Sequence, residues 1–199
     1  MFDRLIISSV CFFSRLRTPC FFTTLFKEQA VIKIIINNKF SKNFMNKEYL
    51  NIYNNFISLT TNKKLYQQLT TQDTFSDRLT LFLLHFAFFL KNFKEQEGKK
   101  KLQEIYDFIF RQIELSIREI GYGDQSINKK MKDYINLFHS IVSEIHFWED
   151  YSKIDKKNKL SLFIENMDKN DYLVDYFNDF KEDLSKKNLN YFLKSVSNR

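Results

Sequence analysis

The sequence predicts an all-α fold, with a single helical bundle domain formed by residues 46–199. Only 3 glycines and 1 proline occur among 199 residues, which is too few for the tight turns of a many-stranded β fold or for a phosphate-binding loop. Apolar residues recur every three or four positions over residues 102–120 and 131–148, as they do on amphipathic helices. A composition that is 44% hydrophobic and 28% charged is ordinary for one globular domain.

Residues 1–45 differ from the remainder of the chain in charge. They contain 7 Lys and Arg against 2 acids, whereas residues 46–199 contain 24 against 22. We expect a poorly ordered N-terminal extension, which is either a targeting segment of the transit type or the product of a mis-assigned start before Met45. The nearly neutral body argues against a nucleic-acid domain and against DNA as a partner. Cys11 and Cys20 are too few for a disulfide framework, so a reducing compartment is expected.

The first half of the predicted domain contains its most apolar helix. Two short helices are expected within residues 46–70, and Asp73, Thr74 and Ser76 then offer capping oxygens to the next helix. That helix is apolar nearly all round over residues 79–90, so it should be central with neighbours on most sides. No window reaches the roughly 18 uncharged apolar residues that span a bilayer, so any membrane role would be peripheral.

Two long antiparallel helices follow and form the centre of the predicted bundle. The apolar stripe of the first is Leu102, Ile105, Ile109, Ile113, Ile117 and Ile120, and that of the second is Met131, Tyr134, Phe138, Ile141, Ile145 and Trp148. The two are joined at a Gly-x-Gly-Asp turn, where Gly121 can adopt the left-handed conformation and Asp124 or Ser126 can cap the second helix. Beyond residue 153, two short amphipathic helices close the bundle.

Catalytic and metal-binding motifs are missing from the sequence. It contains no GxSxG, Walker A, GxGxxG, HExxH, CxxC or ExxH. His139 and His146 stand seven residues apart, a helical rise of about 10.5 Å that is too long for one metal ion. His85 lies in the apolar helix, and we expect a core histidine satisfied by a carboxylate or carbonyl of a neighbouring helix, because an unpaired imidazole would cost about 1–3 kcal/mol. We therefore expect no enzyme, cofactor or metal site.

The predicted turn between the long helices is rich in charge. Arg118 lies near the end of the first helix, where a cation is favourable, but Lys129, Lys130 and Lys132 fall in the first turns of the second, where cations oppose the helix dipole. Local pairing of these cations is one explanation, and a charged corner offered to a partner is the other. The candidates for local pairing are Glu119, Asp124 and Asp133.

Residues on both sides of this turn form a recognisable pattern. The sequence reads Asp73-Thr74, Arg78 and Leu84-His85, then IREIGYGD over residues 117–124, Ile127, and Lys129-Lys130. It resembles the ubiquinol-cytochrome c chaperone family of alphaproteobacteria and mitochondria, in which D-T…R…L-H precedes L-R-E-x-G-V-G-D-x-x-V-x-K-R. The resemblance covers roughly residues 46–150. Residues 138–141 depart from it, because relatives tend to read F-Y-G-R where this chain reads F-H-S-I, so any role of that Gly and Arg is not carried over.

The resemblance implies a non-enzymatic assembly chaperone of the ubiquinol-cytochrome c reductase complex (complex III). It implies newly made cytochrome b as the client, and for mitochondrial members a small helical partner chaperone and the ribosome. The implied location is the cytoplasmic face of a bacterial inner membrane or the matrix side of the mitochondrial one. The motif residues expected at the partner-binding site are Arg78, His85, Arg118, Glu119, Gly121, Gly123, Asp124, Lys129 and Lys130.

Two further features bear on function. The chain is 17% aromatic, and an exposed aromatic patch would suit an apolar client. Most of the aromatic residues are expected to fill the core, and the candidates for an exposed patch are Phe147, Trp148, Tyr176, Phe177 and Phe180. The alternative function is a small helical RNA- or ribosome-binding protein that uses residues 99–101 and Lys129, Lys130 and Lys132, and its affinity would fall steeply with salt. An enzyme site around His85 and Asp77 is a third possibility and would need a cavity beside His85.

Overall fold

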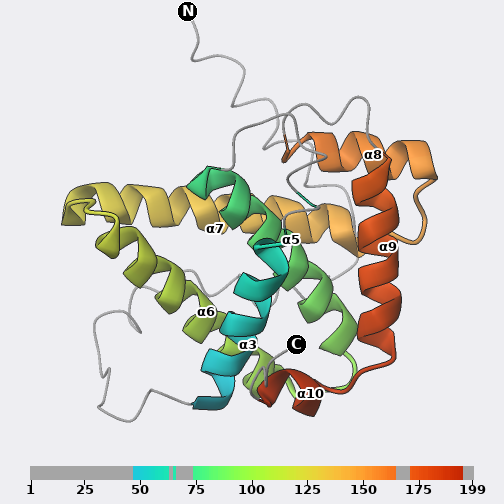
Figure 1. Ribbon diagram of the computed structural model, residues 1–199, viewed down its shortest axis with the longest axis horizontal. Coiled ribbons are helices and arrows are strands. Elements are labelled where there is room, and N and C mark those ends of the chain that lie inside the picture. Colours follow the sequence, from blue (N-terminus) through green and yellow to red (C-terminus); the bar gives the residue numbers. More distant parts are fainter. Residues whose placement is uncertain (1–46, 63–64, 66–73, 165–170, 195–199) are drawn as a thin grey trace, which may run out of the picture. The chain divides into compact units, whose positions relative to one another are not determined.

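The structure of the protein is a computed structural model that describes residues 47–62, 65, 74–164 and 171–194. These residues form helices and no strand, so the predicted all-α bundle is confirmed. The helices are α3 (Lys47–Thr60), α5 (Phe75–Phe93), α6 (Lys99–Glu119), α7 (Asp124–His146), α8 (Lys153–Ser161), α9 (Tyr172–Ser185) and α10 (Leu189–Leu193) (Figure 1). The expected N-terminal extension and most of the expected helix around Leu65 and Leu69 lie outside the described residues, although Leu65 itself is buried.

Helix α5 is the centre of the bundle, as its all-round apolar sequence predicts. Every residue from Leu79 to Leu90 is buried, and α7, α3 and α9 all pack against it (Figure 1). The helix begins at a capping box, in which the Thr74 hydroxyl accepts a hydrogen bond from the Asp77 N–H and the Asp77 carboxylate accepts one from the Thr74 N–H, both 3.2 Å long. Thr74 is one of the three capping residues expected from the sequence.

Helices α6 and α7 meet at the turn of residues 120–123 and diverge from it (Figure 1). Helix α6 buries its predicted stripe as far as Ile117, but Ile120 is 52% exposed because the helix ends at Glu119. Helix α7 packs more extensively on α5 than on α6. Its buried residues are Ile127, Phe138, Ile141 and Ile145. Of the predicted α7 stripe, Met131 and Tyr134 are only half-buried.

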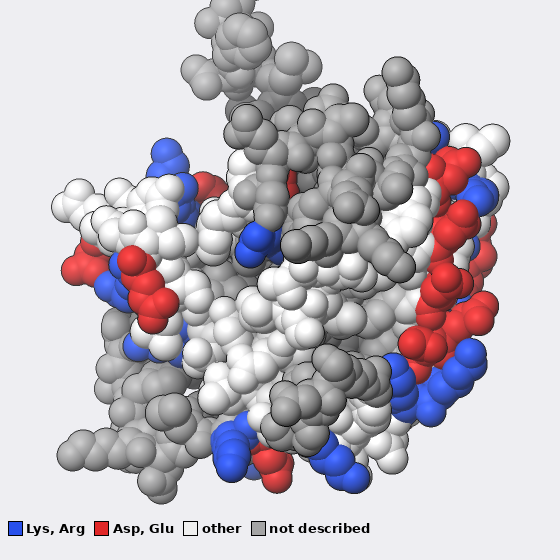
Figure 2. Space-filling model, viewed as in Figure 1, with Lys and Arg blue, Asp and Glu red and all other residues white. Residues whose placement is uncertain are grey.

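Aromatic rings hold α9 against α5. The Phe88 ring of α5 stacks on Phe177 of α9 with centroids 5.3 Å apart, and it lies edge-on to Trp148 at 5.1 Å. The Trp148 indole N–H donates to Oδ1 of Asn178 at 3.0 Å. Trp148 and Phe177 are buried and Tyr176 and Phe180 half-buried, so the expected exposed aromatic patch is wrong apart from Phe147, which is 44% exposed. The outer side of α9 is instead charged, with carboxylates in a row along the helix and lysines at one end (Figure 2).

Lys91 connects the end of α5 to the end of α7. Its ammonium donates to the carbonyls of Ile145 and His146, at 2.9 and 3.1 Å, and pairs with Glu149. A cation at the C-terminus of a helix satisfies carbonyls that have no partner within the helix. Glu149 also accepts from Lys181 of α9, at 2.8 Å. Burial acts to raise the pKa of Glu149, but the hydrogen bonds from Lys181 and Lys91 outweigh it and lower that pKa to about 2.

Candidate partner-binding corner

An ion pair joins the end of α6 to the start of α7, and a second pair lies beside it within α6. The Arg118 guanidinium donates through Nε and Nη2 to Oε1 of Glu114, at 3.1 and 2.9 Å, and through Nη1 to Asp124. Arg118 complements the C-terminus of α6 and Asp124 the N-terminus of α7. Both pairs are exposed to solvent and contribute little to stability, and the Arg118–Asp124 pair is the one that links the two helices. We call residues 114–130 the α6–α7 corner.

The N-terminus of α7 differs from the expectation that Asp124 or Ser126 caps it. The N-cap residue is Gly123, and no side chain makes a capping hydrogen bond there. Asp124 is the first residue of the helix, and its carboxylate turns back to Arg118. The expected cap is wrong because α7 already begins at Asp124, which leaves Gly123, a residue without a side chain, at the N-cap position.

Gly121 provides the reversal of the chain at the corner. Its φ is +98°, in the left-handed region, and its N–H donates to the Arg118 carbonyl at 2.9 Å. The sequence predicts this conformation for a glycine directly after the last helical turn. Gly123 has an ordinary φ of −71°. Only the first of the two glycines is therefore required by the backbone.

Replacing each of these glycines by alanine separates strain from crowding. An added Cβ would meet no atom within 4 Å at either position, so packing is not disturbed. Gly121→Ala should lower the free energy of unfolding by about 1–2 kcal/mol because L-residues are strained at positive φ. Gly123→Ala should cost only about 0.5 kcal/mol, for the loss of a favoured N-cap residue. Urea denaturation of the two variants measures the difference, and equal costs would contradict the strain argument.

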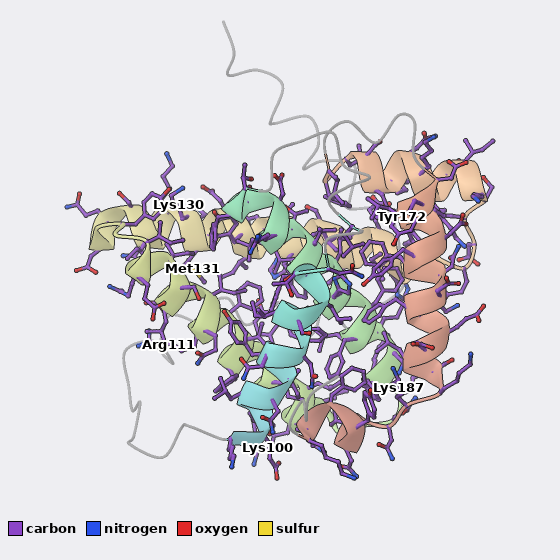
Figure 3. All side chains as sticks on the ribbon, in the orientation of Figure 1. Lys100, Arg111, Lys130, Met131, Tyr172 and Lys187 are labelled. Carbon is purple, nitrogen blue, oxygen red and sulfur yellow. The ribbon has the colours of Figure 1, made fainter. Side chains whose placement is uncertain are left out.

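The surface of the corner combines apolar and charged side chains. Ile120, Tyr122 and Leu115 are 52%, 42% and 37% exposed. Nζ of Lys130 lies 4.4 Å from the centroid of the Tyr122 ring, within range of a cation–π interaction. Figure 3 places Met131 on the side of α7 that faces α6. The corner therefore presents an apolar centre with a charged edge.

The lysines of α7 near the corner do not form the local ion pairs that were one explanation for their position. Lys129 and Lys132 are exposed, and within the described part of the chain they form no ion pair with Glu119 or Asp133. Asp124 does pair, but with Arg118. Lys130 contacts Tyr122 instead of a carboxylate. Local pairing thus explains Arg118 and leaves the α7 lysines open to a partner.

His85 and Arg78 lie on α5 and not in the corner. Arg78 is exposed in the first turn of α5, whereas His85 is fully buried. Nδ1 of His85 donates to the Leu81 carbonyl at 2.6 Å, since a carbonyl can only accept. Nε2 therefore accepts from the Tyr176 hydroxyl of α9 at 2.7 Å. Burial lowers the pKa of His85 to about 4, against a weaker opposing effect of the Leu81 carbonyl.

His85 is thus a satisfied core histidine, as the sequence predicts, but its partners differ from those expected. One is a carbonyl of its own helix and the other is a hydroxyl, where a carboxylate or carbonyl of a neighbouring helix was expected. The rings of Phe180, Phe177 and Tyr176 surround the imidazole, with centroids 4.8, 5.2 and 5.5 Å away. Of the first part of the motif, Leu84 and His85 lie in the core and Thr74 caps α5, whereas the second part of the motif forms the corner.

The proposed enzyme site around His85 and Asp77 is not assembled by the fold. Asp77 belongs to the capping box at the start of α5, about 12 Å along the helix axis from His85. Among the described residues, no three His, Cys, Asp or Glu side chains gather closely enough to hold a metal ion. None of the described helices combines the length and the apolar composition that a membrane span requires.

Part of the chain, including the corner, matches a known protein family. A family model described as ubiquinol-cytochrome C chaperone matches residues 67–146, a segment that contains α5, α6, the corner and α7. Comparisons with curated proteins and with solved structures found no significant match. Helices α3, α8, α9 and α10 lie outside the matched segment. The resemblance read from the motif is therefore confirmed over residues 67–146, which match the ubiquinol-cytochrome c chaperone family model.

Proposed function

We propose that the protein is a non-enzymatic assembly chaperone of the ubiquinol-cytochrome c reductase complex and that its client is newly made cytochrome b. The family match supports a chaperone role, which consists of binding and not of catalysis. A chaperone requires a client, and the complex named by the family contains a membrane subunit in cytochrome b. The site of action is then the inner membrane, on the cytoplasmic side in a bacterium or on the matrix side in a mitochondrion.

The observation that carries this proposal is the composition of the α6–α7 corner. Seven of the nine motif residues fall within it, and none of these seven is buried. Ile120 and Tyr122 lie in the turn between the two helices and are exposed, and tyrosine is enriched among residues that dominate binding energy at interfaces. The turn beneath them is fixed by the Arg118–Asp124 pair and by the left-handed Gly121. We infer that the corner is the client-binding site and that Ile120 and Tyr122 form its centre.

Client capture tests this assignment. Ile120→Ser combined with Tyr122→Ser removes the exposed apolar centre while leaving the buried stripe of α6 intact, so the protein should accumulate normally. In cells that depend on this chain, we expect less cytochrome b in crosslinked complexes with the variant and a lower level of assembled complex III. Ile57→Ser, at a 39% exposed position on α3, is the matched control and should change neither. Unchanged capture by the corner variant would show that the client binds elsewhere.

The alternative, RNA or ribosome binding, has less support from the arrangement of the lysines. The lysines of residues 99–101 begin α6, a helix of 21 residues that spans about 30 Å, whereas Lys129, Lys130 and Lys132 lie on α7, beyond the other end of α6. Figure 3 shows Lys100 at the N-terminal end of α6 and Lys130 at the corner. Lys101 also pairs with Glu97 at 3.2 Å. If the captured material were ribosomal or RNA and dissociated steeply with added salt, this alternative would replace the chaperone proposal. A small helical partner chaperone would appear in the same capture.

A further inference from the structure

Two lysines near the start of α7 carry charge that no carboxylate of the described chain neutralises. Lys129 and Lys132 are both exposed, and neither forms an ion pair with a described residue. They stand three positions apart on one side of the helix, where like charges repel each other. Asp133 follows Lys129 by four positions, but this acid-last order is the less favourable one and the two side chains are not paired. A bound anion would therefore relieve a repulsion that the free protein retains.

The exposed apolar centre of the α6–α7 corner lies at a defined distance from these lysines. It consists of Ile120 and Tyr122, in the turn that precedes α7. Helix α7 begins at Asp124, so Lys129 and Lys132 lie about 8–12 Å along its axis from that end. Three residues of an extended chain, or two turns of a helix, span about 10 Å. One short segment can therefore contact the apolar centre and the lysines together.

Arg118 does not add a free cation to this surface, because its guanidinium is occupied by Glu114 and Asp124. Nζ of Lys130 lies 4.4 Å from the centroid of the Tyr122 ring, so this lysine borders the apolar centre. Figure 3 shows Lys130 at the end of α7 that adjoins the corner. The cations open to a partner are therefore ammonium groups, each of which can bind a carboxylate as a point charge.

Carboxylates near these lysines argue against a polyanion such as RNA. Glu119 at the end of α6 and Asp133 on α7 are both exposed, and neither forms an ion pair with a described residue. A nucleic acid that covers the corner carries a charge at every nucleotide, so it would also meet these carboxylates and be repelled by them. One or two carboxylates can bind the lysines without extending to either acid. The surface therefore favours a protein segment with few acidic residues.

We propose that the corner binds a protein segment in which an apolar side chain and one or two carboxylates lie about 10 Å apart. The apolar side chain packs on Ile120 and Tyr122, and the carboxylates pair with Lys129 and Lys132. Charge complementarity selects this occupant, because unpaired lysines beside an apolar centre match carboxylates beside an apolar side chain. Such a segment is what the client would present to the corner, so the proposal rests on the proposed function.

Peptide binding to the full chain tests this proposal. Three short fluorescent peptides share the same leucines and differ at the positions about 10 Å away, which carry glutamates, glutamines or lysines. In fluorescence anisotropy at low salt, the glutamate peptide should bind about five-fold more tightly than the glutamine peptide, and the lysine peptide should bind most weakly. High salt should remove this preference and leave the binding that the leucines provide. An oligoribonucleotide with the same label is measured beside the peptides.

Variants of the corner separate the ionic contribution from the apolar one. Lys129→Gln with Lys132→Gln should remove the preference for the glutamate peptide. The urea midpoint of this variant should equal that of the wild type or exceed it, because the repulsion between the lysines is gone. Ile120→Ser with Tyr122→Ser should weaken binding of the glutamate and glutamine peptides alike, by about ten-fold.

A charge-matched control accounts for the cations elsewhere in the chain, including those of residues 1–45. Lys100→Gln with Lys186→Gln removes the same total charge from exposed positions on α6 and directly after α9, and it should retain the wild-type preference.

Three results would overturn the proposal. The first is that no peptide binds, and the second is that the preference for glutamate is absent or survives Lys129→Gln with Lys132→Gln. Both would leave the cytochrome b proposal standing, because capture of that client in cells is measured independently. The third is that the oligoribonucleotide binds more tightly than the glutamate peptide through the same two lysines, which would favour the RNA-binding alternative.

Discussion

Replacing His85 by phenylalanine, together with Tyr176→Phe, should remove much of the loss of stability that the protein suffers between pH 7 and pH 5. In the folded protein, burial lowers the pKa of His85 to about 4, whereas an unfolded histidine has a pKa near 6.5. The unfolded chain therefore binds a proton that the folded protein excludes. The contribution of His85 to the free energy of unfolding is therefore constant above about pH 6.5, and it falls as the pH drops from 6.5 to 4.

The size of this effect follows from the separation of the two pKa values. Each unit is worth about 1.4 kcal/mol, so His85 contributes a loss of about 3 kcal/mol over the whole interval and about 2 kcal/mol between pH 7 and pH 5. The second substitution is needed because Tyr176 would otherwise lose the acceptor for its hydroxyl. Urea denaturation at the two pH values gives the difference for the wild type and for the variant.

Two other groups change stability in the same direction and must be separated from His85. Burial also lowers the pKa of His139, so it adds its own loss on acidification, and His139→Gln is the matched control that leaves the effect of His85 in place. Glu149 has its pKa lowered to about 2, and its contribution is lost only as the pH falls below about 4.5. A variant without His85 and Tyr176 that retains the full loss between pH 7 and pH 5 would refute the assignment.

Local sequence signals were sufficient to predict much of the fold. The apolar run of residues 79–90 predicts a central helix, and α5 is that helix because no side of it can face water without cost. The stripe of α6 predicts its buried face, and the scarcity of glycine makes Gly121 conspicuous as the end of α6. These features depend on residues within one or two turns of each other, which is the range over which sequence periodicity carries information.

The parts of the site that the sequence did not predict depend on distant or competing contacts. The hydroxyl that satisfies His85 belongs to Tyr176, 91 residues away, and no local pattern identifies it. Ile120 continues the spacing of a buried stripe and is exposed because α6 ends one residue earlier. Asp124 has the residue type of a cap, but it is the first residue of α7, after Gly123 at the N-cap, and its carboxylate pairs with Arg118. In each case the local sequence allowed more than one arrangement, and the three-dimensional packing of the helices determined which one occurs.

Phe56→Ala should lower the free energy of unfolding by about 3–5 kcal/mol, which is more than Gly121→Ala should cost. The Phe56 ring is fully buried and contacts three rings of α5, with centroids 5.3 Å from Phe89, 5.5 Å from Phe82 and 5.9 Å from Phe86. Truncation removes this apolar contact and leaves a cavity that the surrounding α5 rings cannot fill. Ile57→Ala, at the next residue, is the matched control and should cost less than about 1 kcal/mol because its side chain is 39% exposed.

The single tryptophan makes the same variant a test of cooperativity. Trp148 contacts Phe88 of α5 from the side of α9, so its fluorescence reports on a different part of the core from the one that Phe56 fills. If residues 47–194 unfold as one unit, Trp148 fluorescence and far-UV circular dichroism should shift together in the variant. If the Trp148 fluorescence transition of the variant stays at the wild-type midpoint, α3 unfolds independently of the rest of the core. Helices α3 and α9 both pack against α5, and neither belongs to the family-matched residues 67–146. We therefore expect a single unfolding transition for the whole bundle. The family-matched segment alone should not fold stably.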